Sequence, residues 1–288
     1  MRLYCAENRR APFVETFQRS GQNHGFEVYL VDPGASPSKG FDRFSSLYKH
    51  HSINSAGFEL ACFKRYFAAQ RDMHGHGKFV MADSDIVVQS RWDEMPMTVR
   101  DAGDRFVGSV GYSADGPEDD IAPHFSVWNR ALLSDFIDFL LEQYLNGADE
   151  LAQIYQQRLA RNPRASVSDM TLLAMWQRKR QVPFSNSNIV VDGQPIIDHN
   201  ISTPWTANRK LRNALGRKQL RLGPQGWQFR TDDGHALKAS VLHLQGRYKQ
   251  AANAIEHRQP LALLAVSAYI HLGRKTRALA QTLSHARL

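Results

Sequence analysis

Hydrophobic positions along the chain follow two alternating patterns, one typical of buried strands and one of amphipathic helices. Short apolar runs bounded by turn residues predict strands at 2–6, 26–31, 78–82, 86–88, 106–110, 125–128, 189–191 and 240–243. Apolar residues spaced three and four apart predict helices at 11–21, 55–71, 130–145 and 170–179, and further helices after Lys249. Ser168 is the expected N-cap of the helix at 170–179. The Ser- and Gly-rich stretch from Asp32 to about Ser46 predicts a loop.

Strands that alternate with helices indicate an α/β fold in which a mostly parallel mixed sheet is flanked by helices. Ligands bind such sheets beyond the carboxyl ends of the strands. A chain of 288 residues can form one such domain. We place this domain at residues 1–250 and a basic helical C-terminal extension at 251–288.

The composition argues against several classes of protein. No apolar run approaches the roughly 18 residues of a membrane span, and no apolar segment of a signal peptide follows Arg2. The two cysteines, Cys5 and Cys62, are too few for a disulfide framework or a thiolate zinc site and are expected to be buried free thiols. A cytoplasmic protein is therefore expected.

The net charge of +8 is unevenly distributed. Residues 208–230 contain no acid, and 249–288 contain only Glu256. Such a balance favours an anionic partner, which could be a nucleotide, a nucleic acid or a membrane surface. A solvated basic helix face is the alternative explanation for the tail.

The segment with the most specific chemistry is Asp83-Ser84-Asp85, which directly follows the buried apolar run at 78–82. Two carboxylates at close range disfavour each other's ionisation unless a cation lies between them. Mg²⁺ and Mn²⁺ prefer carboxylate oxygens and are commonly shared with substrate phosphates. The segment therefore predicts a site for a metal and a diphosphate, although a surface turn with two aspartates is the alternative.

Residues 78–88, with Asp83 and Asp85 at the centre, resemble the DXD segment of GT-A-fold glycosyltransferases, in particular glycosyltransferase family 8 and related bacterial polysaccharide enzymes. Downstream, 243–249 is similar to that family's His-X-X-Gly-X-X-Lys signature, with His243, Gly246 and Lys249 at the defining positions. Gln250-Ala251 stands where the family has Pro-Trp. The resemblance spans roughly residues 1–250.

The resemblance implies a role for each of these residues and for several others. Asp83, Asp85 and His243 would hold Mn²⁺ or Mg²⁺, with His199 as the rival third ligand. Asp169, at a helix start, would act near the reacting carbon, and Lys249 would meet the diphosphate. The implied positions around the nucleotide-sugar donor are Ala6, Asn8, Asn54, Arg65, Ser84, Gly246 and Lys249.

The implied activity is metal-dependent transfer of a sugar from a UDP- or GDP-linked donor, with UDP favoured, to a hydroxyl group. The acceptor would be a bacterial polysaccharide or another glycan, or a lipid-linked oligosaccharide. Family membership implies retention of configuration, whereas Asp169 as a base would allow inversion. The basic tail could dock peripherally on the anionic inner membrane, through Arg274, Lys275, Arg277 and Arg287.

Two other functions agree with part of the sequence. A non-catalytic nucleic-acid-binding protein would explain the charge, but no zinc-finger or RRM signature is present and paired acids would repel phosphates, so no nucleic-acid partner is expected. A metal-dependent nucleotidyltransferase would also use two carboxylates. No Walker-type phosphate loop, Gly-X-Ser-X-Gly elbow or His-Glu-X-X-His motif occurs.

Overall fold

The computed structural model describes residues 1–35, 38–73 and 77–285, with the side chains of 274–285 excepted. Within these ranges, six strands form the main sheet in the order β2-β1-β3-β6-β5-β7. The pairs β1–β2, β1–β3 and β5–β7 are parallel, whereas β3–β6 and β5–β6 are antiparallel. The strands are β1 (Arg2–Ala6), β2 (Glu27–Val31), β3 (Phe79–Ala82), β5 (Phe106–Ser113), β6 (Gly116–Trp128) and β7 (Phe184–Asn186).

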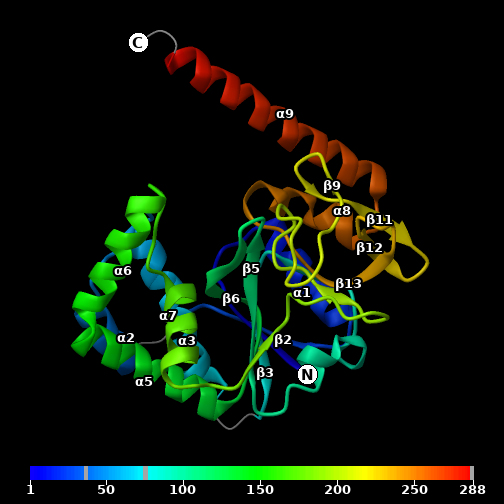
Figure 1. Cartoon of the computed structure of the whole chain (residues 1–288). Coiled ribbons are helices and arrows are strands. Elements are labelled where there is room, and N and C mark those ends of the chain that lie inside the picture. The colour runs from blue at the N-terminus through cyan, green and yellow to red at the C-terminus, as the bar shows by residue number, and fades with distance from the viewer. Residues whose placement is uncertain (36–37, 74–76, 286–288) are drawn as a thin grey trace.

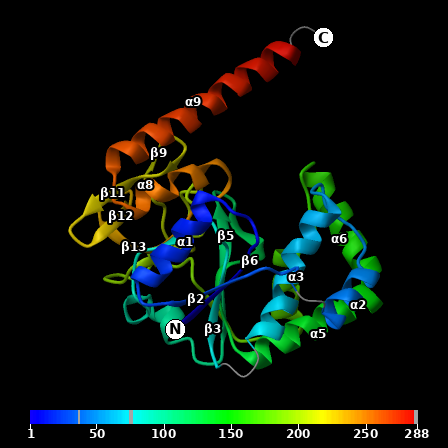
Figure 2. The same cartoon turned by 180° about the vertical axis from the view of Figure 1, so that it is seen from behind.

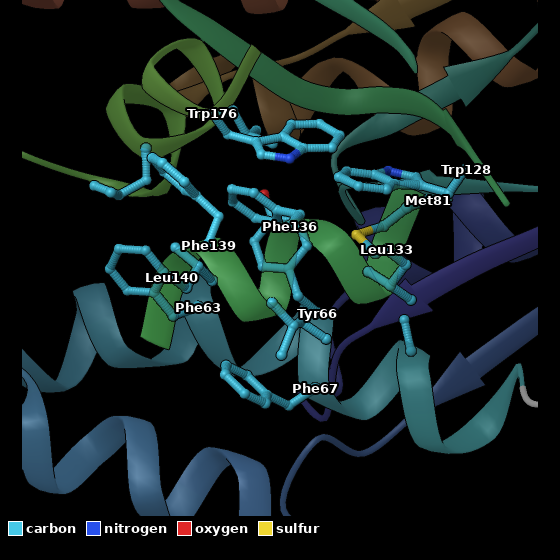
Figure 3. Close-up of a cluster of buried hydrophobic side chains, with 14 of the residues drawn as sticks. Phe63, Tyr66, Phe67, Met81, Trp128, Leu133, Phe136, Phe139, Leu140 and Trp176 are labelled. Carbon is cyan, nitrogen blue, oxygen red and sulfur yellow. The ribbon is translucent and has the colours of Figure 1, made fainter. Parts of the chain in front are cut away.

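Helices cover one face of this sheet and bury most of the aromatic core (Figure 1). Alternate residues of a strand point to opposite faces, so Phe79 and Met81 join this core while Val80 and Ala82 join the other one. In Figure 3, Trp128 from the sheet and Trp176 from a covering helix lie near Phe136. These helices are α2 (Lys39–Leu47), α3 (Ala56–Asp72), α5 (Arg130–Asn146), α6 (Ala148–Arg161) and α7 (Asp169–Lys179).

A second, smaller sheet packs with α1 (Pro12–Asn23) against the opposite face of the main sheet. Its strand order is β11-β12-β13-β4, and β8 pairs in parallel with β13. A separate two-stranded ladder, β9–β10, lies beside it. The strands are β4 (Ile86–Val88), β8 (Ile196–Ile197), β9 (Asn213–Ala214), β10 (Arg217–Lys218), β11 (Leu220–Gly223), β12 (Gly226–Arg230) and β13 (Ala236–His243).

The C-terminal part is helical, as expected. After β13 the chain forms η2 (Gly246–Ala251), α8 (Ala252–Glu256) and the long α9 (Pro260–His285). Two short elements, η1 (Trp92–Glu94) and α4 (Met97–Arg100), follow β4. The first turns of α9 pack against the elements of the second sheet, and the helix then projects away from both sheets (Figures 1 and 2). Within the described ranges, no helix combines the length and apolar character that spanning a bilayer requires.

The expected α/β class, with a mixed sheet between helices and a helical C-terminus, is confirmed. Two local predictions are wrong: the segment expected as a loop up to Ser46 contains α2, and the run 189–191 is not a strand. The strand expected at 125–128 is confirmed, and it begins already at Gly116. Cys5 and Cys62 are both free, as predicted; Cys5 is buried as expected, whereas Cys62 is only half-buried.

Candidate active site

Asp83-Ser84-Asp85 is the point where the chain passes from one sheet to the other. β3 ends at Ala82 in the main sheet, and β4 begins at Ile86 in the second sheet. The backbone N–H of Asp83 donates to the carbonyl of His124 (3.0 Å), and the carbonyl of Asp85 accepts from Leu244 N–H (2.9 Å). Each aspartate is thus fixed by backbone hydrogen bonds to a different sheet.

The strand register brings His243 to these carboxylates. β13 runs antiparallel to β4 with His243 opposite Ile86, the residue after Asp85. His243 Nε2 lies 3.3 Å from Asp85 Oδ1 and 4.0 Å from Asp83 Oδ2. One ligand atom from each of the three side chains lies within 4.8 Å of the others. The structure therefore brings the three predicted metal ligands together.

The donor set fits a hard divalent cation. His243 Nδ1 lies 2.5 Å from the carbonyl oxygen of His199, and because a carbonyl only accepts, Nδ1 must carry the hydrogen. Nε2 then faces the two carboxylates and needs a proton or a cation between itself and them. Asp85 Oδ1 is buried and has no hydrogen-bond partner among the described residues. Two carboxylate oxygens and one imidazole nitrogen suit Mn²⁺, and also Mg²⁺ with water or phosphate completing the shell.

The charges in this cluster are strongly coupled. Burial raises the pKa of Asp85, but contacts with His243 and Lys249 outweigh it and bring the pKa down to about 2. Burial lowers the pKa of His243, and the Asp85 and Asp83 carboxylates more than offset it, so the net shift is upward. The pKa of Asp83 is raised by burial and by the charge of Asp85, against the lowering effect of Arg65. Asp85 is therefore ionised and ready to bind a cation at neutral pH.

Lys249 completes this side of the site. Its Nζ lies 3.0 Å from Asp85 Oδ2 and 4.9 Å from the centroid of the Phe13 ring. The turn that leads from β13 to Lys249 uses Gly246 at φ +61°, a conformation that favours glycine. A positive charge is thus held beside the presumptive metal position, where it can contact a phosphate.

Arg65 joins the Asp-X-Asp segment to the start of α7. Its guanidinium lies 2.5 Å from Asp83 Oδ1 and also donates to Asp169 Oδ2, which accepts a further hydrogen bond from the Tyr66 hydroxyl (2.9 Å). The Asp169 side chain is only 4% exposed. The structure therefore brings Arg65 and Asp169 together with the metal cluster and fixes the Asp169 carboxylate with two donors.

The end of β1 contacts the middle residue of the Asp-X-Asp segment. The Ser84 hydroxyl donates to Glu7 Oε2 (2.7 Å), and Arg9 Nε donates to Glu7 Oε1 (2.8 Å). Burial raises the pKa of Glu7, but these hydrogen bonds outweigh it and lower the pKa to about 2. Ala6 ends β1, and Asn8 donates to Asp32 Oδ1 (3.3 Å) at the end of β2. Ala6, Asn8 and Ser84 thus lie at one edge of the fold.

Two predicted candidates are placed differently. Asn54 precedes α3 and its amide donates to Glu59 Oε1 (2.9 Å); no described contact links it to the metal cluster. His199 lies outside the cluster: its Nδ1 is 2.8 Å from Ser109 Oγ, and it contacts His243 through its backbone carbonyl.

Other contributors were missed at the level of sequence. The His124 ring stacks on His243 at 4.3 Å between centroids, and Tyr66 binds Asp169. His124 is separated from Asp83 by 41 positions and belongs to the neighbouring strand β6, so only strand pairing could have revealed it. A cavity of about 300 Å³ elsewhere, between α3 and α5, includes none of the cluster residues.

No protein-family model matches the chain, and a search of curated protein sequences gives no match. Among solved structures, the chain is similar to the galactosyltransferase LgtC, crystallised with donor and acceptor sugar analogues, at 12% identity over 93% of this chain and 95% of that one, with a TM-score of 0.46.

Two further similarities are more partial. Mouse xyloside xylosyltransferase 1 matches at 11% identity over 64% of this chain and 83% of that one (TM-score 0.40). A glycosyltransferase involved in glycosylation of the major capsid of PBCV-1 matches at 12% identity over 50% of this chain and 67% of that one (TM-score 0.29). All three are glycosyltransferases by name, the class that the sequence resembles.

Proposed function

We propose that the chain is a metal-dependent glycosyltransferase that uses a nucleoside-diphosphate sugar. The observation that carries the proposal is the convergence of Asp83, Asp85 and His243, whose ligand atoms all lie within 4.8 Å of one another. These residues would hold Mn²⁺ or Mg²⁺. When bound, the cation supplies a Lewis acid for the negative charge of a diphosphate leaving group. The proposed donor is a UDP- or GDP-linked sugar, with UDP favoured.

Residues around the cluster have separate proposed roles. Lys249 would contact the diphosphate as charge develops on it, because its Nζ is held beside Asp85. Gly246 would let the backbone approach a phosphate closely, and Ala6, Asn8 and Ser84 line the edge proposed for the base and ribose. Asn54 contributes nothing to this arrangement by any described contact.

Asp169 is proposed to act near the reacting carbon of the sugar. Two donors, Arg65 and Tyr66, bind its Oδ2 atom, and its Oδ1 atom accepts from the Met170 N–H (3.0 Å). A carboxylate held on both oxygens is fixed in position and can balance positive charge on the sugar. Retention of configuration is proposed, and inversion with Asp169 as the base is the alternative.

The test is a thermal-shift panel of nucleotide sugars with and without Mn²⁺. A ligand at 100 times its dissociation constant stabilises a folded protein by about 2.7 kcal/mol, so a UDP- or GDP-sugar should raise the melting temperature by several degrees when Mn²⁺ is present. Asp85→Asn should abolish the metal-dependent part. The matched control is Asp104→Asn, since the Asp104 side chain is 95% exposed. A panel without any Mn²⁺-dependent shift would contradict the proposal.

The acceptor is proposed to be a hydroxyl of a glycan or lipid-linked oligosaccharide at an anionic membrane. Large apolar residues are exposed on the described part of α9, with Leu261 81% and Leu272 61% exposed. The basic residues proposed for this contact, Arg274, Lys275, Arg277 and Arg287, lie outside the described side chains. Co-sedimentation with anionic vesicles should be stronger for the full chain than for a chain ending at Gly273. Equal sedimentation of the two forms would reject this docking.

A further inference from the structure

A buried ion pair lies directly behind the proposed metal ligand His243. Lys218 Nζ is 2.5 Å from Asp198 Oδ1, and both side chains are completely buried. Removing two charges from water is costly, and such a pair is weak grounds for assuming a gain in stability. A gain in stability therefore does not explain why Asp198 and Lys218 are paired at this position.

The second oxygen of Asp198 binds His243 itself. Asp198 Oδ2 accepts from the backbone N–H of His243 (3.2 Å). The Ile201 N–H donates to the carbonyl of His243 (3.2 Å), and the Lys218 N–H donates to the carbonyl of Ile201 (2.7 Å). The next residue after Asp198 provides the carbonyl that accepts from His243 Nδ1. The segment 198–201 thus holds His243 at its backbone N–H, its carbonyl and its ring.

The same segment limits the ring in a third direction. His124 Nε2 lies 3.0 Å from the carbonyl oxygen of Asp198, and its ring is stacked on that of His243 with only 5° between the planes. Rotation of the His243 imidazole would break the Nδ1 hydrogen bond and the stacking together. Groups that fix the tautomer and orientation of a metal-binding histidine typically change metal affinity by 10–100-fold when mutated.

We infer that Asp198 and Lys218 are positioning residues that hold segment 198–201 so that His243 Nε2 faces Asp83 and Asp85. Lys218 binds Asp198 and thereby keeps the carboxylate on the backbone of His243. Neither side chain is among the three proposed metal ligands. This inference rests on the proposed metal site and adds to it the residues on which its affinity depends.

The neighbouring residue offers a matched control. Arg217 is also buried and comes from the same strand. Its Nε donates to Ser267 Oγ of α9 (2.7 Å) and its Nη1 to the backbone carbonyl of Lys218 (2.8 Å), so it holds the same strand without binding the Asp198 carboxylate. Lys218→Met and Arg217→Met each remove a buried cation from β10. Loss of stability is expected in both, whereas loss of metal affinity is expected only in Lys218→Met.

The experiment measures Mn²⁺ binding to the full chain by the electron paramagnetic resonance of free Mn²⁺, with and without UDP, beside urea denaturation. Lys218→Met should bind Mn²⁺ at least 10-fold more weakly than wild type, and Arg217→Met within about 3-fold. Equal affinity of Lys218→Met and wild type, or equal losses in the two variants, would overturn the inference. A wild-type chain that binds no Mn²⁺ under either condition would instead overturn the metal site itself.

A second measurement needs no variant at position 218. In wild-type chain labelled with ¹⁵N-histidine, the His243 signal, assigned by its loss in His243→Gln, should show a hydrogen on Nδ1 that exchanges slowly with solvent. Slow exchange supports the positioning by segment 198–201. An Nδ1 without hydrogen at alkaline pH, or one that exchanges at the rate of exposed histidines, contradicts it even if Lys218→Met does not fold.

Discussion

At the scale of single residues, Glu7 connects the charge of the site to the stability of the fold. The Glu7 side chain is 7% exposed and binds Arg9 and the Ser84 hydroxyl. Its pKa falls from 4.5 to about 2 on folding. A carboxylate with a lowered pKa contributes stability above its unfolded pKa and loses that contribution as pH falls through the folded pKa. The pKa difference corresponds to at most about 3 kcal/mol.

We therefore expect Glu7→Gln to destabilise the protein most at pH 5 and above. The difference in unfolding free energy between wild type and variant should shrink from pH 4.5 and be nearly gone at pH 2, as measured by urea denaturation across this range. Glu15→Gln, an exposed glutamate on α1, should show no comparable pH dependence. A difference that stays constant down to pH 2 would show that the Glu7 charge is not responsible.

The residues of the site divide into those that sequence could identify and those that required coordinates. Asp83, Asp85, His243 and Lys249 are recognisable because two short motifs fix their chemical types and order, and the structure brings them within reach of one another. The contact of Arg65 with Asp169 joins positions 104 apart, and no local pattern encodes it. Lys218 lies in the basic run 208–230, which indicated an anionic partner, and nothing in that run points to a buried contact with Asp198.

At the scale of elements, the long periodic helices and buried strands were predictable because burial imposes their spacing. Helix α2 was not, because Gly40, Ser45 and Ser46 within it and the turn residues Asp32-Pro33-Gly34 before it are typical of a loop. It forms because Phe44, which is fully buried, packs against Phe63 at 5.0 Å between ring centroids, and because Ser38 caps it by accepting from Phe41 N–H (3.3 Å). Tertiary packing here outweighs weak helix propensity.

The strand predicted at 189–191 is absent although its central residue is buried. Val190 is buried, as an apolar run predicts. Its backbone groups, however, are bonded to a side chain and not to a neighbouring strand. Asn208 Oδ1 accepts from Val190 N–H (2.9 Å), and Asn208 Nδ2 donates to the Val190 carbonyl (2.8 Å). A long-range amide thus satisfies the backbone, and the apolar pattern alone could not distinguish this from a sheet.

At the scale of the whole molecule, some of the Lys and Arg side chains are buried and bound by other residues of the chain. Lys218 is bound to Asp198 and Arg217 to Ser267, both in buried surroundings. These cations are therefore not available to a phosphate backbone in the folded state. The Lys218–Asp198 pair already cancels in the net charge of +8, so only Arg217 removes a net positive charge from the surface that a nucleic acid would meet.

The division at residue 250 between a catalytic domain and an extension stays a prediction, and the contacts across it suggest how to test it. The Trp227 indole donates to the Ile255 carbonyl (2.7 Å), and Arg19 pairs with Glu256 (2.6 Å). Ile255 and Ile270 are fully buried in the core beneath the second sheet. Residues after 250 are thus in contact with both α1 and β12.

Two truncated chains would measure how much these contacts contribute to the stability of the fold. A chain ending at Lys249 loses Ile255, Leu263 and Ile270, each of which contributes about 1.5–3 kcal/mol by burial, and it should unfold at a much lower urea concentration than wild type. A chain ending at Gly273 keeps all three residues and should unfold near the wild-type midpoint. If the chain ending at Lys249 also keeps the wild-type midpoint, residues 250–273 are an appendage, and the second sheet is stable without them. The opposite outcome would make them part of the catalytic domain, because β13, which carries His243, packs on the core that they complete.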